Sequence, residues 1–148
     1  MSSKSTPDIY NLNRFITAQE NIYEIALNEI KLGKKHSHWM WFIFPQIAGL
    51  GESEKSKEFS IHSKEEAHEY LRHPILGKRL KLITKTLFTH KGKPITNLFE
   101  YPDNLKLQSS MTLFSKVNND KNDLYFQVIK TFFDGKYDDS TLDILRNL

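Results

Sequence analysis

The sequence predicts an all-α protein, folded as a single compact multihelical domain of about six to eight helices with no substantial sheet. Apolar side chains recur at the three- and four-residue spacing of amphipathic helices along most of the chain. Residues typical of helix starts and stops stand on either side of those stretches. The one extended-looking stretch, residues 59–61, is too short to build a sheet. A length of 148 residues is that of one domain, so we expect a flexible tail over residues 1–8 and a helical domain over residues 9–148.

The first third of the chain carries two helix signals. Residues 12–18 predict one or two helical turns. Asn21 followed by Glu24 has the form of a capping box, in which each residue satisfies a backbone N–H at a helix start. Gly33 is a typical helix terminator because glycine readily adopts the left-handed conformation. We therefore expect a helix from Asn21 to Gly33, and the apolar stripe of this helix has one polar exception, Glu29.

The rest of the chain continues in the same helical style. Ser63, followed three residues later by Glu66, predicts a helix start, and Pro74 predicts that this helix ends before it. Further helices are expected over residues 75–88, 104–114 and 124–133, with a last one that Asp139 or Ser140 caps.

Composition excludes several classes of function. The chain has no cysteine, which removes disulfides, thiolate catalysis and cysteine-ligated metals. Neither a signal peptide nor an apolar run near the ~20 residues that span a bilayer is visible, so we expect a cytoplasmic protein without a membrane partner. The formal net charge of +3 is too low for a dedicated nucleic-acid binder. We expect the basic groups at 31–35 and 78–81 to be solvated helix surface, and no cofactor is implied.

Residues 36–51 form the most function-like stretch. Both tryptophans of the chain, Trp39 and Trp41, lie in it. Residues two apart on a helix point to different sides, so at least one of the rings faces something other than a shared core layer. The stretch then reaches Gly49 and Gly51, and glycines permit a close approach of backbone to a ligand. Two interpretations stay open: a core helix followed by a tight loop, or the aromatic wall and glycine-lined floor of a pocket.

Two histidines are candidate general bases, because imidazole titrates near neutral pH. They are His38, which precedes an aromatic residue, and His73, which precedes a proline. The alternative for each is a hydrogen-bonded, partly buried ring. The spacing of the six histidines does not place two metal ligands on one helix face, so no metal site is predicted.

A lysine and two serines form the third candidate group. On a helix, Lys106, Ser109 and Ser110 fall on neighbouring positions. A lysine beside two hydroxyls can form a binding site for phosphate or carboxylate. The alternative is that the small serines allow close packing between helices.

The aromatic stretch also carries a resemblance to a known family. Its core, SHWMWFIFPQ over residues 37–46, is followed by Gly49-Leu50-Gly51-x-Ser53. Further matches run over residues 10–19, 66–80 and 106–114, so the resemblance covers nearly the whole chain from Asp8. The chain resembles the domain-of-unknown-function family 1810, conserved bacterial proteins sometimes labelled "calpastatin". The resemblance implies an all-α, multihelical fold and no established activity, and the calpastatin label does not suit a chain with the composition of a packed core.

The family's motif blocks coincide with the stretches singled out above, which suggests one site. We expect a pocket that combines an aromatic surface with basic, amide and hydroxyl groups: Gln19, His38, Trp39, Trp41, Gln46, the loop from Gly49 to Gly51, His73, Arg79, Lys106, Ser109 and Ser110. Such a pocket suits a phosphate-bearing small molecule, either a nucleotide or an ADP-ribose-like ligand.

Each class of residue in this pocket has an expected role. One of the two tryptophans would stack on a base, and Arg79 and Lys106 would pair with phosphate. Gln46 would hydrogen-bond to a polar edge of the ligand. His38 is the acid or base if the ligand is turned over, but no complete nucleophile–base pair is visible, so binding and turnover both stay open. Two alternatives also stay open: an exposed aromatic face that binds a protein, and single-stranded RNA binding by the same rings.

Overall fold

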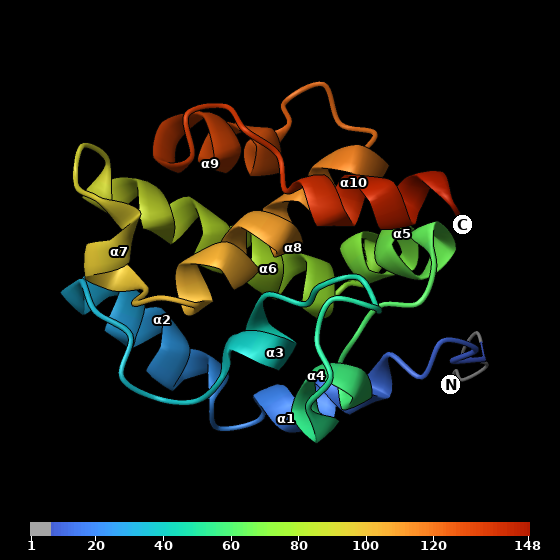
Figure 1. Cartoon of the computed structure of the whole chain (residues 1–148). Helices are drawn as coiled ribbons and strands as arrows, with labels where there is room; N and C mark the ends of the chain where they lie inside the picture. The colour runs from blue at the N-terminus through green and yellow to red at the C-terminus, as the bar shows by residue number, and fades with distance from the viewer. Residues whose placement is uncertain (1–6) are drawn as a thin grey trace.

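The chain folds into helices joined by short turns (Figure 1). The computed structural model describes residues 7–148, so residues 1–6, most of the expected tail, lie outside the described residues. Ten α-helices and one 3-10 helix follow one another over residues 7–148: α1 (Asn13–Gln19), α2 (Tyr23–Leu32), α3 (Met40–Ile43), α4 (Glu54–Glu58), α5 (Lys64–Arg72), α6 (Leu76–Thr86), η1 (Leu87–His90), α7 (Ile95–Leu98), α8 (Asp103–Val117), α9 (Leu124–Phe132) and α10 (Asp139–Arg146). The all-α class is confirmed.

The expected number of six to eight helices is wrong. Three of the ten α-helices described, α3, α4 and α7, have only four or five residues. A helix of that length has no periodic apolar stripe and is not stable alone, so sequence periodicity does not reveal it. Each is held by its surroundings instead. Helix α3 is anchored in the core by the buried side chains of Met40 and Ile43. Helix α7 is anchored in the same way by Ile95 and Leu98, and the Ser53 hydroxyl caps α4.

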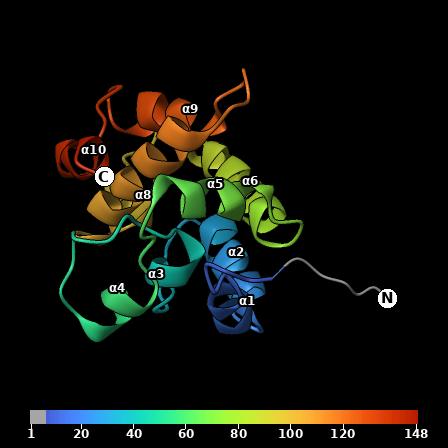
Figure 2. The ribbon, with the colours of Figure 1, turned by 90° about the vertical axis from the view of Figure 1, so that its right-hand side faces the viewer.

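The longest helix, α8, lies at the centre, with α3, α5, α9 and α10 packed around it (Figures 1 and 2). From Leu107 to Ser115 every residue except Gln108 is buried. A helix that contacts neighbours on every side is buried all round, which is why its apolar residues do not form a single stripe. None of the helices over residues 7–148 is long and apolar enough to cross a membrane.

Several predicted helix ends are confirmed. Gly33 ends α2 in the left-handed conformation, with φ of 97°. The Ser63 hydroxyl accepts the backbone N–H of Glu66 at 3.0 Å and so caps α5. The same helix ends at Arg72, before Pro74. These ends are determined by one or two neighbouring residues, which is why local sequence reveals them.

Two predicted helix starts are wrong. Asn21 adopts a left-handed φ of 63° and does not cap α2, which begins at Tyr23. A side-chain cap requires extended backbone at the cap residue, and the tight turn between α1 and α2 does not leave Asn21 that conformation. The cap of α10 is Asp138 rather than Asp139 or Ser140, and its carboxylate accepts a first-turn N–H at 3.0 Å.

Residues 59–61 contribute a single backbone bridge rather than a strand. Ile61 pairs with Ile47 in parallel. The Ile61 N–H donates to the carbonyl of Gln46 at 2.8 Å, and the Ala48 N–H donates to the carbonyl of Ile61 at 2.7 Å. This bridge ties the loop after α3 to the segment after α4. The loop and α4 therefore form one excursion from the domain, on the side of α10 and away from α6 (Figure 2).

Candidate functional site

Trp39, the residue before α3, is sealed in the core. Its side chain is fully buried and packs edge-to-face against the ring of Phe99, with 6.1 Å between the ring centroids. The indole Nε1 donates a hydrogen bond to a carboxylate oxygen of Glu29 at 2.9 Å. A fully buried ring offers no face to a ligand, so Trp41 is the tryptophan that can form a stacking surface.

Glu29 on α2 is the polar centre of this part of the core. Besides the indole, its carboxylate accepts the backbone N–H of His36 at 2.8 Å, that of Ser37 at 3.0 Å, and the Ser37 hydroxyl. Burial alone would raise the pKa of Glu29, but the Ser37 hydroxyl, the two backbone groups and the indole together lower it to about 2. Glu29 is therefore a structural carboxylate that holds the chain before α3 against α2. In the sequence, the position of Glu29 within an otherwise apolar helix stripe is the feature that indicates a buried carboxylate with hydrogen-bond partners.

Trp41, inside α3, is half-buried and lines two clefts. The first, which we name the glycine cleft, has a volume of about 330 Å³. Its walls are Trp41, Gln46, the loop from Gly49 to Gly51, Lys57, Phe59 and His62. Residues 41–51 reach one cleft because they are close in sequence, whereas residues 57–62 are brought back to them by the bridge between Ile47 and Ile61.

Both glycines of this cleft have a structural reason to be glycine. Gly49 has φ of 104°, and a Cβ there would lie 3.3 Å from Cδ1 of Ile144. A Cβ on Gly51 would lie 2.7 Å from the Ser56 hydroxyl oxygen. The loop that results leaves donors unused: among the hydrogen bonds between residues 7–148, none is donated by the backbone N–H of Gly49, Leu50 or Gly51. Successive free N–H groups in a turn are suited to bind an anion.

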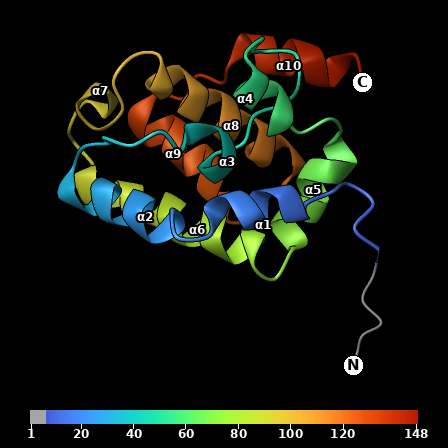
Figure 3. The same ribbon diagram turned by 90° about the horizontal axis from the view of Figure 1, so that it is seen from below.

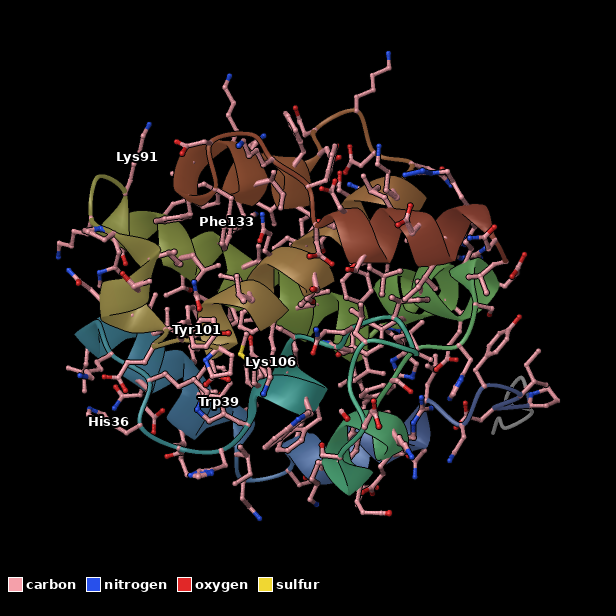
Figure 4. All side chains as sticks on the ribbon, in the orientation of Figure 1. His36, Trp39, Lys91, Tyr101, Lys106 and Phe133 are labelled. Atoms are coloured by element: carbon pink, nitrogen blue, oxygen red, sulfur yellow. The ribbon has the colours of Figure 1, made fainter. Side chains whose placement is uncertain are left out.

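The second cleft beside Trp41, which we name the histidine cleft, has a volume of about 290 Å³. It is lined by Lys35, His36, His38, Met40, Trp41, Glu100 and Asp103. The Asp103 carboxylate lies 2.8 Å from Nζ of Lys35 and 3.5 Å from Nζ of Lys106. Lys106 also lies over the Trp41 ring, 4.9 Å from its centroid, and Figure 4 shows it extending from α8 towards α3. Packing of α8 against α3 thus brings the predicted Lys106 to the predicted Trp41.

Gln19 and Arg79 contact each other, but they lie outside both clefts. Nη1 of Arg79 donates to the Gln19 amide oxygen at 3.1 Å. The Gln19 amide nitrogen donates to the carbonyl of Phe42 at 2.8 Å and to the Tyr70 hydroxyl at 3.1 Å. Burial raises the pKa of Tyr70, so its hydroxyl stays neutral. This network joins α1, α3, α5 and α6, which is a structural role.

His73 and the two serines also lie outside the clefts. Nδ1 of His73 accepts the backbone N–H groups of Ile75 at 3.1 Å and Leu76 at 3.2 Å, which is the position of a helix cap at the start of α6. The Ser109 hydroxyl donates to the Asp138 carboxylate at 3.2 Å. The Ser110 hydroxyl is fully buried and has no hydrogen-bond partner within residues 7–148.

The structure thus gathers half of the predicted pocket around Trp41. The residues that it brings there are His38, Trp41, Gln46, Gly49, Gly51 and Lys106. Those that it places elsewhere are Gln19, Trp39, His73, Arg79, Ser109 and Ser110. Nothing in the sequence singles out Lys57 and His62, because they are common surface residues. The extended-looking residues 59–61 are the one signal that the chain returns here. Within residues 7–148, no three His, Asp or Glu side chains are grouped closely enough to hold a metal ion.

Comparison with known proteins agrees with the helical fold. The crystal structure of the conserved hypothetical protein Rv1873 from Mycobacterium tuberculosis has 39% sequence identity and a TM-score of 0.91, and the match covers 94% of this chain and 99% of that chain. No curated protein matches the chain. The family described as "Protein of unknown function (DUF1810)" matches over residues 9–145. Since that match spans almost the whole sequence, as the aromatic stretch and its companion motifs predict, the chain belongs to the DUF1810 family.

Proposed function

We propose that the protein binds a phosphate-bearing small molecule, a nucleotide or an ADP-ribose-like ligand, in the glycine cleft. One observation carries this proposal: the partly exposed indole of Trp41 lines the same cleft as Gly49, Leu50 and Gly51, whose backbone N–H groups donate no hydrogen bond within residues 7–148. An indole face stacks on a nucleobase. Successive backbone N–H groups in a turn bind phosphate oxygens.

The other walls of the cleft suit the same ligand. Gln46 supplies an amide for a polar base edge, Lys57 supplies a cation, and His62 supplies an imidazole. A volume of about 330 Å³ lies at the small end of ligand sites. We therefore expect the cleft to hold a mononucleotide, and a longer ADP-ribose-like ligand would extend past Trp41 into the histidine cleft.

In this proposal Lys106 positions the Trp41 ring and does not bind phosphate. Its ammonium is already engaged by the Trp41 ring, at 4.9 Å from the centroid, and by the Asp103 carboxylate at 3.5 Å. A cation held over one face of an indole stabilises the ring and leaves the opposite face for a base. This arrangement assigns Lys106 a different role from the phosphate contact that the sequence predicts.

The cleft supports binding better than turnover. The two serine hydroxyls that line it are engaged locally, that of Ser56 with the carbonyl of Ser53 and that of Ser60 with the carbonyl of Lys57, both at 3.0 Å. A nucleophilic serine requires an adjacent base that accepts its proton, and these hydroxyls donate to carbonyl oxygens instead. We therefore propose a binding function for this site.

The two alternatives that the aromatic stretch suggests have less support. Trp39, Phe42 and Phe44 are buried, so the stretch presents the half-exposed ring of Trp41 rather than a broad aromatic face. A protein-docking surface is expected to be a contiguous apolar patch, and single-stranded RNA is expected to stack on several rings. One ring beside free N–H groups favours a small ligand.

Titration with AMP, ADP, ADP-ribose and inorganic phosphate tests the proposal, with binding measured by calorimetry and by tryptophan fluorescence. We expect a nucleotide to quench the fluorescence, since Trp41 is accessible and Trp39 is not. Phosphate alone is expected to bind more weakly, because it has no ring to stack. In Trp41→Leu the calorimetric signal for the nucleotide should be lost.

Tyr101→Leu is the matched control, because Tyr101 is an aromatic residue that is 76% exposed and lines neither cleft. This variant should bind as the wild type does. Saturable binding that is equal in wild type and Trp41→Leu, or no saturable binding of any of the four compounds, would contradict the proposal.

A further inference from the structure

The basic residues of the chain are unevenly distributed. Residues 70–99 contain seven lysines and arginines and no aspartate or glutamate. Because the whole chain carries a net charge of +3, the residues outside this segment carry a net charge of −4. The segment comprises the last three residues of α5, including Arg72, and then α6, η1 and α7 with their connecting turns. The modest overall charge therefore conceals a strongly basic part of the molecule.

Helix α6 carries three of these charges on one solvent-facing side. Lys78, Lys81 and Lys85 are exposed and are spaced by three and four residues, so they form a stripe along the helix. The opposite side of α6, which includes Leu80 and Ile83, is buried in the core. The stripe is therefore held on a rigid support.

Three more exposed lysines lie on segments that neighbour α6. Lys31 lies at the end of α2, and Lys91 and Lys93 follow η1; Figure 4 shows Lys91 projecting away from the molecule. Helices α2 and α6 lie side by side (Figure 3). Their alignment is parallel, because the start of α2 bonds to α6, where the Tyr23 hydroxyl donates to the carbonyl of Arg79 at 2.7 Å. The end of α2 bonds to η1, where the His90 imidazole contacts the carbonyl of Ile30 at 2.6 Å.

These six lysines, which we name the basic face, are free of carboxylate partners. Within residues 7–148 none of them lies within 4 Å of an aspartate or glutamate oxygen. The acidic residues nearby are engaged or distant: Glu20, after α1, is 3.6 Å from Arg79, Glu24 lies in the first turn of α2, and the Glu29 carboxylate is buried and accepts hydrogen bonds from residues 36–39. Uncompensated cations on one face of a protein attract a polyanion.

We propose that the basic face binds the phosphate backbone of duplex nucleic acid without base specificity. A lysine stripe neutralises phosphates and releases counterions, which needs no contact with the bases. Single strands are disfavoured because they require aromatic stacking, and the aromatic residue among the exposed large hydrophobic side chains of residues 7–148 is Tyr101, outside this face. A lipid surface is disfavoured because the apolar side of α6 is already used in the core, and the exposed apolar side chains beside these lysines, Leu82 on α6 and Leu32 at the end of α2, are too few to form an interfacial apolar face.

The basic face lies apart from the glycine cleft. In Figure 2, α6 is on the side of the molecule opposite to α4 and α10, and the cleft is lined from the loop before α4. Binding of a nucleic-acid phosphate backbone by the basic face is therefore independent of the proposed nucleotide site. Either proposal can be wrong while the other holds.

Fluorescence anisotropy with a short labelled DNA duplex, measured between about 50 and about 200 mM salt, tests the proposal. We expect the affinity of the wild type to fall steeply with salt. In the triple variant Lys78→Gln, Lys81→Gln, Lys85→Gln, affinity at low salt should fall at least about tenfold, and the slope of log affinity against log salt should become shallower by roughly two to three. Replacing the same three lysines by arginine should preserve binding.

A second triple variant controls for net charge. Lys121, Lys130 and Lys136 are also exposed but lie on α9 and its flanking turns rather than on α6. Changing them to glutamine removes the same charge from outside the basic face and should leave affinity nearly unchanged. Equal losses in the two triple variants, or no salt-dependent binding by the wild type, would overturn the proposal. Stronger binding to phosphatidylglycerol vesicles than to the duplex would overturn it in favour of a lipid surface.

Discussion

Trp39 and Trp41 are two residues apart, yet they belong to different regions of the molecule. Trp39 is fully buried, whereas Trp41 is half-exposed and lines two clefts. Helix α3 begins between them, at Met40, so Trp41 lies on the helix whereas Trp39 precedes it with a non-helical backbone. An aromatic stretch that looks like one functional block can therefore be part core and part surface.

The partners of the two rings differ in the same way. The N–H of Trp39 donates to Glu29, a carboxylate whose other hydrogen bonds hold the preceding loop. Trp41 instead lies under the ammonium of Lys106, which is shared with Asp103. The first ring therefore has a structural role, whereas the proposed ligand binding depends on the second, and variants of the two regions test this difference.

Trp39→Ala should have the largest effect on folding. It removes a fully buried indole and leaves Glu29 without one of its donors. Truncating a buried tryptophan costs about 3 to 5 kcal/mol in the free energy of unfolding. For a chain of this length we expect the melting temperature to fall by about 10 °C, measured by circular dichroism. A fall of only a degree or two would show that Trp39 is not the core residue described here.

Glu29→Gln should have the next largest effect, and that effect should depend on pH. The folded-state pKa of Glu29 is lowered to about 2 from 4.5, so the unfolded chain binds a proton more readily than the folded one. The stability that Glu29 contributes is therefore present above about pH 4.5 and is lost as pH falls towards 2. We expect the variant to be about 3 kcal/mol less stable than the wild type at neutral pH.

Urea unfolding of both proteins at several pH values measures this dependence. The difference between wild type and Glu29→Gln should shrink by about 2 kcal/mol between neutral pH and about pH 3. The matched control is Glu65→Gln, because Glu65 is an exposed first-turn residue of α5 and its substitution should leave the pH dependence close to that of the wild type. A difference between wild type and Glu29→Gln that does not vary with pH would rule out the buried carboxylate as its cause.

The parts of the fold that the sequence predicts are those encoded by adjacent residues. The Ser63 cap and the Gly33 terminator each depend on a few neighbours, and both are confirmed. The short helices α3 and α7 depend on burial in the assembled core, so no local pattern reveals them. Asn21 fails as a cap because the turn between two packed helices imposes its backbone conformation.

The residues of the candidate site also differ in how well the sequence predicts them. Trp41, Gln46, Gly49 and Gly51 are near one another in sequence, so their meeting in one cleft could be anticipated. Lys106 reaches Trp41 through the packing of α8 on α3, which a motif can suggest but not demonstrate. Ser109 and Ser110, which belong to one of the family-like motifs, are buried, so a motif residue can lie in the core rather than at a site.

Trp41→Ala should have the smallest effect on stability and the largest on ligand binding. The ring is half-exposed, and its cation–π contact with Lys106 is worth about 0.5 to 1 kcal/mol at such a site. We therefore expect a cost of about 1 to 2 kcal/mol in unfolding free energy, smaller than that of Trp39→Ala. The fluorescence that remains in Trp41→Ala comes from Trp39 alone and should resist quenching by acrylamide, because that ring is sealed. Ready quenching of this remaining fluorescence, or a loss of stability as large as that of Trp39→Ala, would mean that the two rings do not divide the core from the cleft.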